Sequence, residues 1–90
     1  MGKDITALRA EIDRIDRELT VLLEQRLNIA DQIADYKQKN HLPVLDPVRE
    51  RSVIEKNCDR LSDQENQADC KAFFTALMAI SRERQKRKMK

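Results

Sequence analysis

The sequence predicts an all-α fold with three helices per protomer, one long and two shorter, in an intertwined homodimeric helical bundle. Its 90 residues include one glycine and two prolines, and 38% are charged and 40% apolar, which fits neither a β-rich nor a disordered chain. Apolar positions recur at steps of three and four over residues 4–39, and two helix-start patterns follow residue 43. With no internal repeat or linker, residues 1–90 are expected to form a single domain.

The first helix is expected over about residues 4–39. Its apolar residues form a heptad seam in which Arg26 takes the one position that should be apolar. At ~1.5 Å per residue this helix is about 50 Å long, whereas a compact chain of this size has a radius of gyration of about 12 Å. Two short helices cannot cover it, so the seam predicts a second copy of the chain. The seam consists of Ile5, Leu8, Ile12, Ile15, Leu19, Leu22, Ile29, Ile33 and Tyr36.

The second helix is expected over about residues 47–61. Pro43 disfavours helical geometry in the residue before it, so the first helix should stop near Asn40. Asp46 is a good N-cap acceptor, and Pro47 suits the first position of a helix. The inner face of this helix would carry Ile54, Cys58 and Leu61.

The third helix is expected over about residues 63–86. The segment SDQE, residues 62–65, has the spacing of a capping box, with Ser62 as the cap and Glu65 three residues later. The apolar face of this helix would carry Cys70, Phe73, Phe74, Leu77 and Met78.

Polar residues interrupt the inward face of each helix. Lys37 follows Arg26 by eleven residues, which returns it to within about 20° of the same face. Glu50, next to Arg49, lies one turn before an apolar position of the second helix. An unpaired buried cation costs several kcal/mol, so these positions need an explanation. The third helix continues its apolar line with Ser81 and Gln85.

Most of these residues have an ordinary explanation when each is taken alone. Arg26 could set the register of the seam beside a carboxylate, or extend its guanidinium to solvent. Lys37 could be a solvated cation and Asp46 a helix cap only. Arg49 and Glu50 could form a solvated first turn. Together, inward cations from separate helices with few inward acids predict a pocket for a small anion.

Arg9 lies 28 residues before Lys37, about 42 Å along the same helix. It therefore cannot share a pocket with Lys37 of its own chain. An early residue of one chain can meet a late residue of a crossing partner, so a functional Arg9 would mean a site shared between two subunits.

Metals, membranes and nucleic acids are not expected as partners. Cys58 and Cys70 lack C-x-x-C spacing, and with His41 they give too few ligands for zinc. Both cysteines are expected to be reduced and His41 to lie in an exposed loop. No stretch resembles a signal or transmembrane segment, so we expect a cytoplasmic protein. Residues 82–90 hold six cations and one acid, which we interpret as a helix end suited to the negative end of the helix dipole.

These polar residues occur in segments that resemble the all-helical (AroQ-type) chorismate mutases, chorismate mutase type II, over nearly the whole chain. The resemblance implies an intertwined homodimer with two active sites, each completed by Arg9 of the partner subunit. The absence of a fused dehydratase or dehydrogenase segment leads us to expect a stand-alone mutase. The matching segments are ALRAEIDRIDREL with Arg9, LLEQRLNIA with Arg26, ADYK with Lys37, DPVRE with Asp46, Arg49 and Glu50, and SRERQ with Ser81 and Gln85.

The resemblance implies an isomerase of the shikimate pathway, which converts chorismate to prephenate for phenylalanine and tyrosine biosynthesis. This unimolecular Claisen-type rearrangement needs no metal or cofactor, only positioning and electrostatic stabilisation. By resemblance, Arg26 and the partner subunit's Arg9 would bind the two carboxylates of chorismate, for which guanidinium groups are suited. Arg49 and Ser81 would support the carboxylates.

The resemblance assigns the remaining site residues to the other polar atoms of chorismate. Lys37 and Gln85 would donate to the ether oxygen as its bond to the ring lengthens. Glu50, with Asp46, would accept a hydrogen bond from the ring hydroxyl.

Two alternative functions stay open. One is an isochorismate pyruvate lyase on the same scaffold, which binds a dicarboxylate and breaks the same kind of ether bond; the acceptors in DPVRE favour the mutase. The other is a non-enzymatic helical dimer or adaptor. It predicts inward cations paired with protein carboxylates, no empty pocket, and binding through the basic tail.

Overall fold

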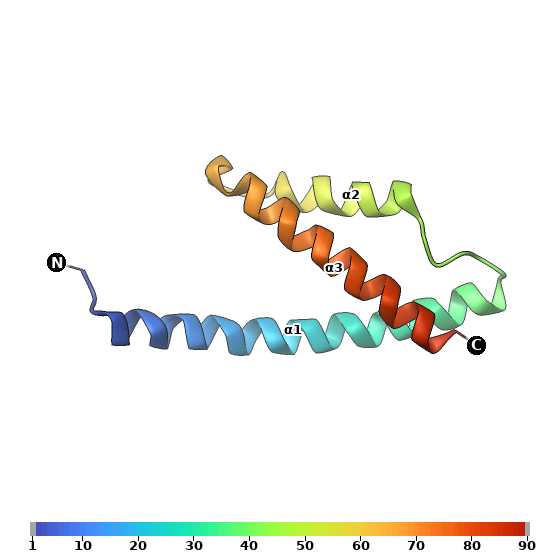
Figure 1. Cartoon of the computed structure of the whole chain (residues 1–90), viewed down its shortest axis with the longest axis horizontal. Helices are drawn as coiled ribbons and strands as arrows, with labels where there is room; N and C mark the ends of the chain where they lie inside the picture. The colour runs from blue at the N-terminus through green and yellow to red at the C-terminus, as the bar shows by residue number, and fades with distance from the viewer. Residues whose placement is uncertain (1, 90) are drawn as a thin grey trace.

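The computed structural model describes residues 2–89, which form three α-helices and no strand. The helices are α1 (Ile5–Lys39), α2 (Pro47–Cys58) and α3 (Gln67–Lys88), with a 3-10 turn, η1 (Gln64–Asn66), before α3. The all-α prediction is confirmed. In Figure 1, α3 runs diagonally from the end of α2 to the C-terminal half of α1, and it contacts both helices.

Local hydrogen bonds fix both ends of α1. Asp4 caps its start, because the carboxylate accepts from the backbone N–H of Ala7 at 2.8 Å. At the other end, the N–H of Leu42 donates to the carbonyl of Lys37 at 2.8 Å, across a turn in which His41 has φ = 55°. Histidine is one of the residues that tolerate this left-handed conformation. The turn is a Schellman motif, and it ends α1 at Lys39, four residues before Pro43.

The helix α2 ends at Cys58, three residues earlier than the end expected near Leu61. The N–H of Leu61 bonds back to the carbonyl of Cys58 at 3.3 Å and that of Arg60 to Asn57 at 3.1 Å. These are tight turn bonds between residues three apart, which replace the helical pattern at its end. The side chain of Gln67, at the start of α3, also donates to the Cys58 carbonyl at 2.7 Å. This bond supplies a partner for a carbonyl at the end of α2.

The predicted capping box at Ser62 is wrong. Asp63 is the cap, since its carboxylate accepts from the N–H of Glu65, two residues on, at 2.9 Å. A bond over two residues opens a tight Asx turn and not an α-helix. The chain therefore makes the single turn η1, and α3 begins at Gln67, four residues after the expected start. At its other end α3 continues to Lys88, beyond the expected residue 86.

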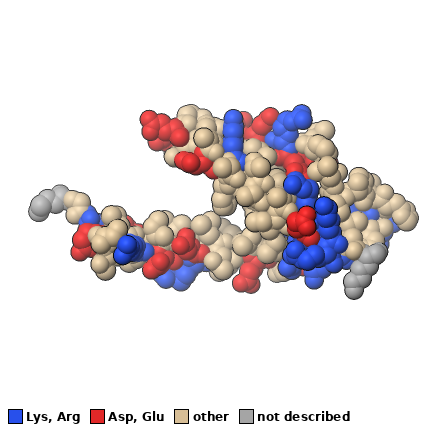
Figure 2. Space-filling model, in the orientation of Figure 1, with Lys and Arg blue, Asp and Glu red and all other residues tan. Residues whose placement is uncertain are grey.

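The single chain has little apolar core. The nine seam residues of α1 are each 40–62% exposed. The radius of gyration is 16.5 Å, against about 12 Å for a compact chain of this length. Figure 2 shows an open notch between the N-terminal half of α1 and the arm formed by the other helices. The buried apolar residues are Ala30, Ala34, Val53, Cys58 and Met78.

An ion pair joins the C-terminal part of α3 to α1. The guanidinium of Arg84 makes two hydrogen bonds with the carboxylate of Asp31, at 2.7 and 2.9 Å, and Lys88 lies 3.9 Å from the same group. The bond from Arg84 is the main reason why the pKa of Asp31 is lowered. The basic end thus does more than complement the helix dipole: two of its cations hold α3 against α1.

Cys58 and Cys70 are free thiols on facing ends of α2 and α3. Cys58 is buried, and burial, followed by its hydrogen bond with Cys70, raises the pKa of its thiol to about 11. No cluster of three or more metal-ligating side chains occurs within residues 2–89. None of the helices in this range has an apolar stretch long enough to cross a membrane.

Candidate functional site

A cavity of about 350 Å³ lies where α3 meets the C-terminal half of α1 and the start of α2. Every predicted site residue except Arg9, which was expected to come from a partner subunit, lines this cavity. Four cations, two carboxylates and several apolar side chains line this space. The predicted residues at its wall are Arg26, Lys37, Asp46, Arg49, Glu50, Ser81 and Gln85; Arg82 and the apolar residues Ile29, Ala30, Ile33, Val53 and Met78 complete it.

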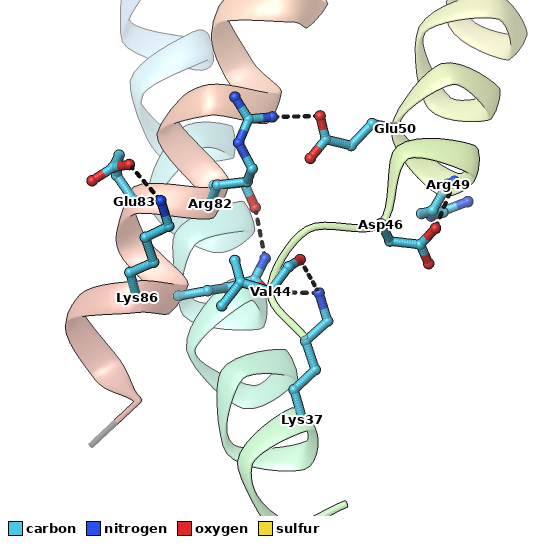
Figure 3. Close-up of polar contacts among 10 residues, drawn as sticks. Lys37, Val44, Asp46, Arg49, Glu50, Arg82, Glu83 and Lys86 are labelled. Carbon is cyan, nitrogen blue, oxygen red and sulfur yellow. Dashed lines mark hydrogen bonds and ion pairs between the residues drawn. The ribbon is translucent and has the colours of Figure 1, made fainter. Parts of the chain in front are cut away.

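Lys37 is held by the connector between α1 and α2 and by α3. Its ammonium group donates to the carbonyl of Val44 at 2.7 Å and to Oε1 of Gln85 at 2.9 Å. Figure 3 shows Lys37 pointing to that carbonyl. An ammonium group carries three protons, so one remains for a ligand. Both partners are neutral, and no carboxylate within residues 2–89 forms an ion pair with Lys37.

Gln85 is the one buried polar residue of the described chain, with 6% of its surface exposed. Its Oε1 accepts from Lys37, and its Nε2 donates to Oγ of Ser81, one turn earlier, at 3.2 Å. These two bonds fix which way the amide faces. The second N–H of the amide is left as a donor inside the cavity.

Arg26 and Arg49 are two cations without a counter-ion. Within residues 2–89 neither guanidinium forms an ion pair with a carboxylate. Burial, and after it the charge of Arg49, lowers the pKa of Arg26. Arg26 is partly buried and Arg49 is exposed, and a bound anion would offset the repulsion between their like charges.

The start of α2 brings its polar residues to the cavity. Asp46 caps the helix by accepting from the N–H of Arg49 at 3.0 Å, and Pro47 follows at the first helical position. One carboxylate oxygen of Asp46 makes that bond, and the other remains an acceptor. Glu50, the residue after Arg49, forms an ion pair with Arg82 of α3 (Figure 3). The residues that begin α2 therefore also line the cavity.

Arg82 and the carbonyl of Val44 are site groups that sequence reasoning missed. We assigned Arg82 to the basic tail, yet it lies one turn after Met78 and one turn before Gln85, both of which line the cavity. That spacing could have identified it. A backbone carbonyl in a loop leaves no such signal in a sequence.

Arg9 does not line this cavity. It is exposed on the N-terminal half of α1, 17 residues before Arg26, which is about 26 Å along the helix. The chain cannot bring these two arginines together by itself.

The chain is similar to a family, and to individual proteins, described as chorismate mutases, and to a T-protein. A model of the family described as chorismate mutase type II matches residues 8–86. The chorismate mutase of Methanocaldococcus jannaschii is 30% identical over 69 residues, which are 73% of this chain and 70% of that protein. The bifunctional chorismate mutase/prephenate dehydratase of Aquifex aeolicus is 44% identical over 54 residues, 60% of this chain. The T-protein of Haemophilus influenzae is 40% identical over 48 residues, 53% of this chain.

The chain is much shorter than some of these relatives. The match covers 15% of the bifunctional protein of Aquifex aeolicus and 13% of the T-protein. No solved structure gives a significant match.

Proposed function

Because the chain belongs to the chorismate mutase type II family, we propose that it rearranges chorismate to prephenate. The observation that carries this proposal is the cavity at the junction of the three helices. Within residues 2–89, Arg26, Arg49 and Lys37 face it without forming an ion pair, and the carboxylates of Asp46 and Glu50 line the same cavity as acceptors. This charge pattern suits a small dianion that also carries a hydroxyl group.

The rearrangement requires little chemistry from the protein. Within one molecule of chorismate, the bond between the ring and the ether oxygen breaks while a carbon–carbon bond forms. No proton, electron or group passes to the enzyme. Catalysis then consists of holding the folded conformer and placing donors where negative charge develops on the ether oxygen.

Arg26 and Arg49 are the carboxylate-binding groups of the proposed site. Burial, and after it the charge of Arg49, lowers the pKa of Arg26, and a carboxylate that lies between or beside the two guanidinium groups would relieve their repulsion. Ser81 adds a hydroxyl that is oriented by Gln85. Guanidinium groups bind carboxylates through two parallel hydrogen bonds, which also fixes the orientation of the ligand.

Lys37 and Gln85 are the proposed donors to the ether oxygen. Nζ of Lys37 donates to Oε1 of Gln85 at 2.9 Å, and Nζ of Lys37 and Nε2 of Gln85 each keep one proton for a ligand. A donor that is already oriented stabilises developing charge without reorganisation, and one such donor contributes about 3–4 kcal/mol. Glu50 and the free oxygen of Asp46 are the proposed acceptors for the ring hydroxyl.

The working molecule is proposed to be an intertwined homodimer. The nine seam residues of α1 are 40–62% exposed in the single chain, and burying them on a second copy would supply the core that one chain lacks. A crossing copy would also bring its N-terminal half near the cavity. Arg9 of the partner subunit would then bind the second carboxylate of chorismate.

The test is product identification with purified protein. Chorismate absorbance should fall, and acid should convert the product to phenylpyruvate, which identifies prephenate. The Lys37→Ala variant serves as the matched control for contaminating activity. Release of pyruvate from isochorismate, with chorismate unchanged, would instead identify the lyase on this scaffold. No turnover of either substrate would leave a non-enzymatic dimer and overturn the proposal.

A further inference from the structure

The proposed chemistry leaves the ion pair between Arg82 and Glu50, at the cavity wall, unexplained. Arg82 comes from α3 and Glu50 from α2, 32 residues away in the sequence. The two side chains point toward one another in Figure 3, and they are 30% and 21% exposed. Both residues line the cavity, beside the proposed donor Gln85.

A purely structural role accounts poorly for this pair. The helices α2 and α3 are already in contact, each contributes a buried apolar residue, Val53 and Met78, and Gln67 bonds to the carbonyl of Cys58. A partly exposed ion pair contributes little to folding on its own. Its position at the cavity wall is therefore the more informative property.

The charge of Glu50 is a difficulty for the proposed ligand. A carboxylate facing a dianion repels it, and a carboxylate free to rotate is a poorly oriented acceptor. The guanidinium of Arg82 counters both effects, because it offsets the charge and engages Oε1 of Glu50. Oε2 is then left to accept a hydrogen bond from the ligand.

We infer that Arg82 is a positioning residue, which orients and neutralises the Glu50 carboxylate so that Glu50 can accept from the ring hydroxyl of a dianionic substrate. This inference rests on the proposed function. It assigns Arg82 no contact with the reacting atoms, so its effect on turnover should pass through Glu50.

A double-mutant cycle on the full chain tests the inference. We would measure kcat and KM for chorismate in the wild type, Arg82→Ala, Glu50→Gln and the double variant. Arg82→Ala should lower kcat/KM about tenfold in the wild-type background and at most about twofold when Glu50 is already glutamine. Arg82→Lys, which restores the charge without the planar fork, should recover KM more than kcat.

Arg87→Ala is the matched control, because it removes the same charge from an exposed position of α3 outside the cavity. It should leave kcat/KM unchanged, and thermal unfolding of every variant checks the fold. If Arg82→Ala does not fold, Arg82→Gln takes its place in the cycle.

Equal losses from Arg82→Ala in both backgrounds would mean that Arg82 acts independently of Glu50, and would overturn the inference while wild-type activity upholds the proposed function. An inactive wild type would overturn the proposed function and this inference with it.

Discussion

Replacing Lys37 with alanine removes an ammonium group that reaches two other parts of the site. The group donates to the carbonyl of Val44 at 2.7 Å and to Oε1 of Gln85 at 2.9 Å. In the proposed mechanism its third proton stabilises the ether oxygen. The variant therefore loses one catalytic donor and also the partner that orients another.

The expected magnitude follows from these contacts. Loss of one oriented donor to developing negative charge costs about 3–4 kcal/mol, or roughly a 100- to 1,000-fold fall in kcat. Gln85 is only 6% exposed, and its Oε1 would lose its donor, which lowers the free energy of unfolding by about 1–3 kcal/mol. The change in kcat should therefore exceed the change in stability, and the protein should remain folded.

The assay is initial-rate turnover of chorismate, with thermal unfolding of the same preparations. Lys39→Ala is the matched control, since Lys39 lies two residues further along α1, is 73% exposed and pairs with Asp35 at 3.0 Å. It should leave kcat unchanged. Near wild-type turnover in a folded Lys37→Ala protein would remove Lys37 from the mechanism.

Three further predictions concern pH and reactivity. Activity should change little between mildly acidic and neutral pH, because Gln85 donates without needing to gain a proton; a steep loss in a pH–rate profile would contradict its role as donor. Arg84 lowers the pKa of Asp31 from 3.8, so this carboxylate stabilises the fold above that pH and the contribution disappears as pH falls through the lowered value. Unfolding measured at neutral pH and below pH 3.8 should show a smaller acid-induced loss in Asp31→Asn than in the wild type, and equal losses would disprove the linkage. With a thiol reagent at mildly alkaline pH, Cys70 should react before Cys58, whose pKa is raised to about 11 by burial; mass spectrometry of the labelled protein distinguishes the two orders.

Much of the cavity could be predicted because its residues interrupt strong helical patterns. Arg26 stands at an apolar position of a long seam, and Lys37 follows on the same face, so helix geometry alone aligns them. Asp46 and Pro47 form a start pattern whose register then fixes the direction of Glu50. These inferences need only the periodicity of the helix, and the structure brings the three polar residues Arg26, Lys37 and Glu50 to one cavity.

The parts that sequence reasoning missed depend on contacts between segments. The segment SDQE predicted a cap at Ser62, whereas Asp63 is the cap, in the short turn that links α2 to α3. Arg82 was assigned to a basic tail because its partner, Glu50, lies 32 residues away. The carbonyl of Val44, which accepts from Lys37, belongs to a loop, and no pattern in the sequence predicts the conformation of that loop.

Mixing two inactive variants tests the shared, positively charged site most directly. Arg9→Ala and Lys37→Ala proteins are each expected to be inactive as homodimers. After co-refolding in equal amounts, half of the dimers should be mixed and contain one intact site, which gives roughly a quarter of wild-type activity. Activity that stays at the level of the separate variants would place the whole site within one chain and contradict the account.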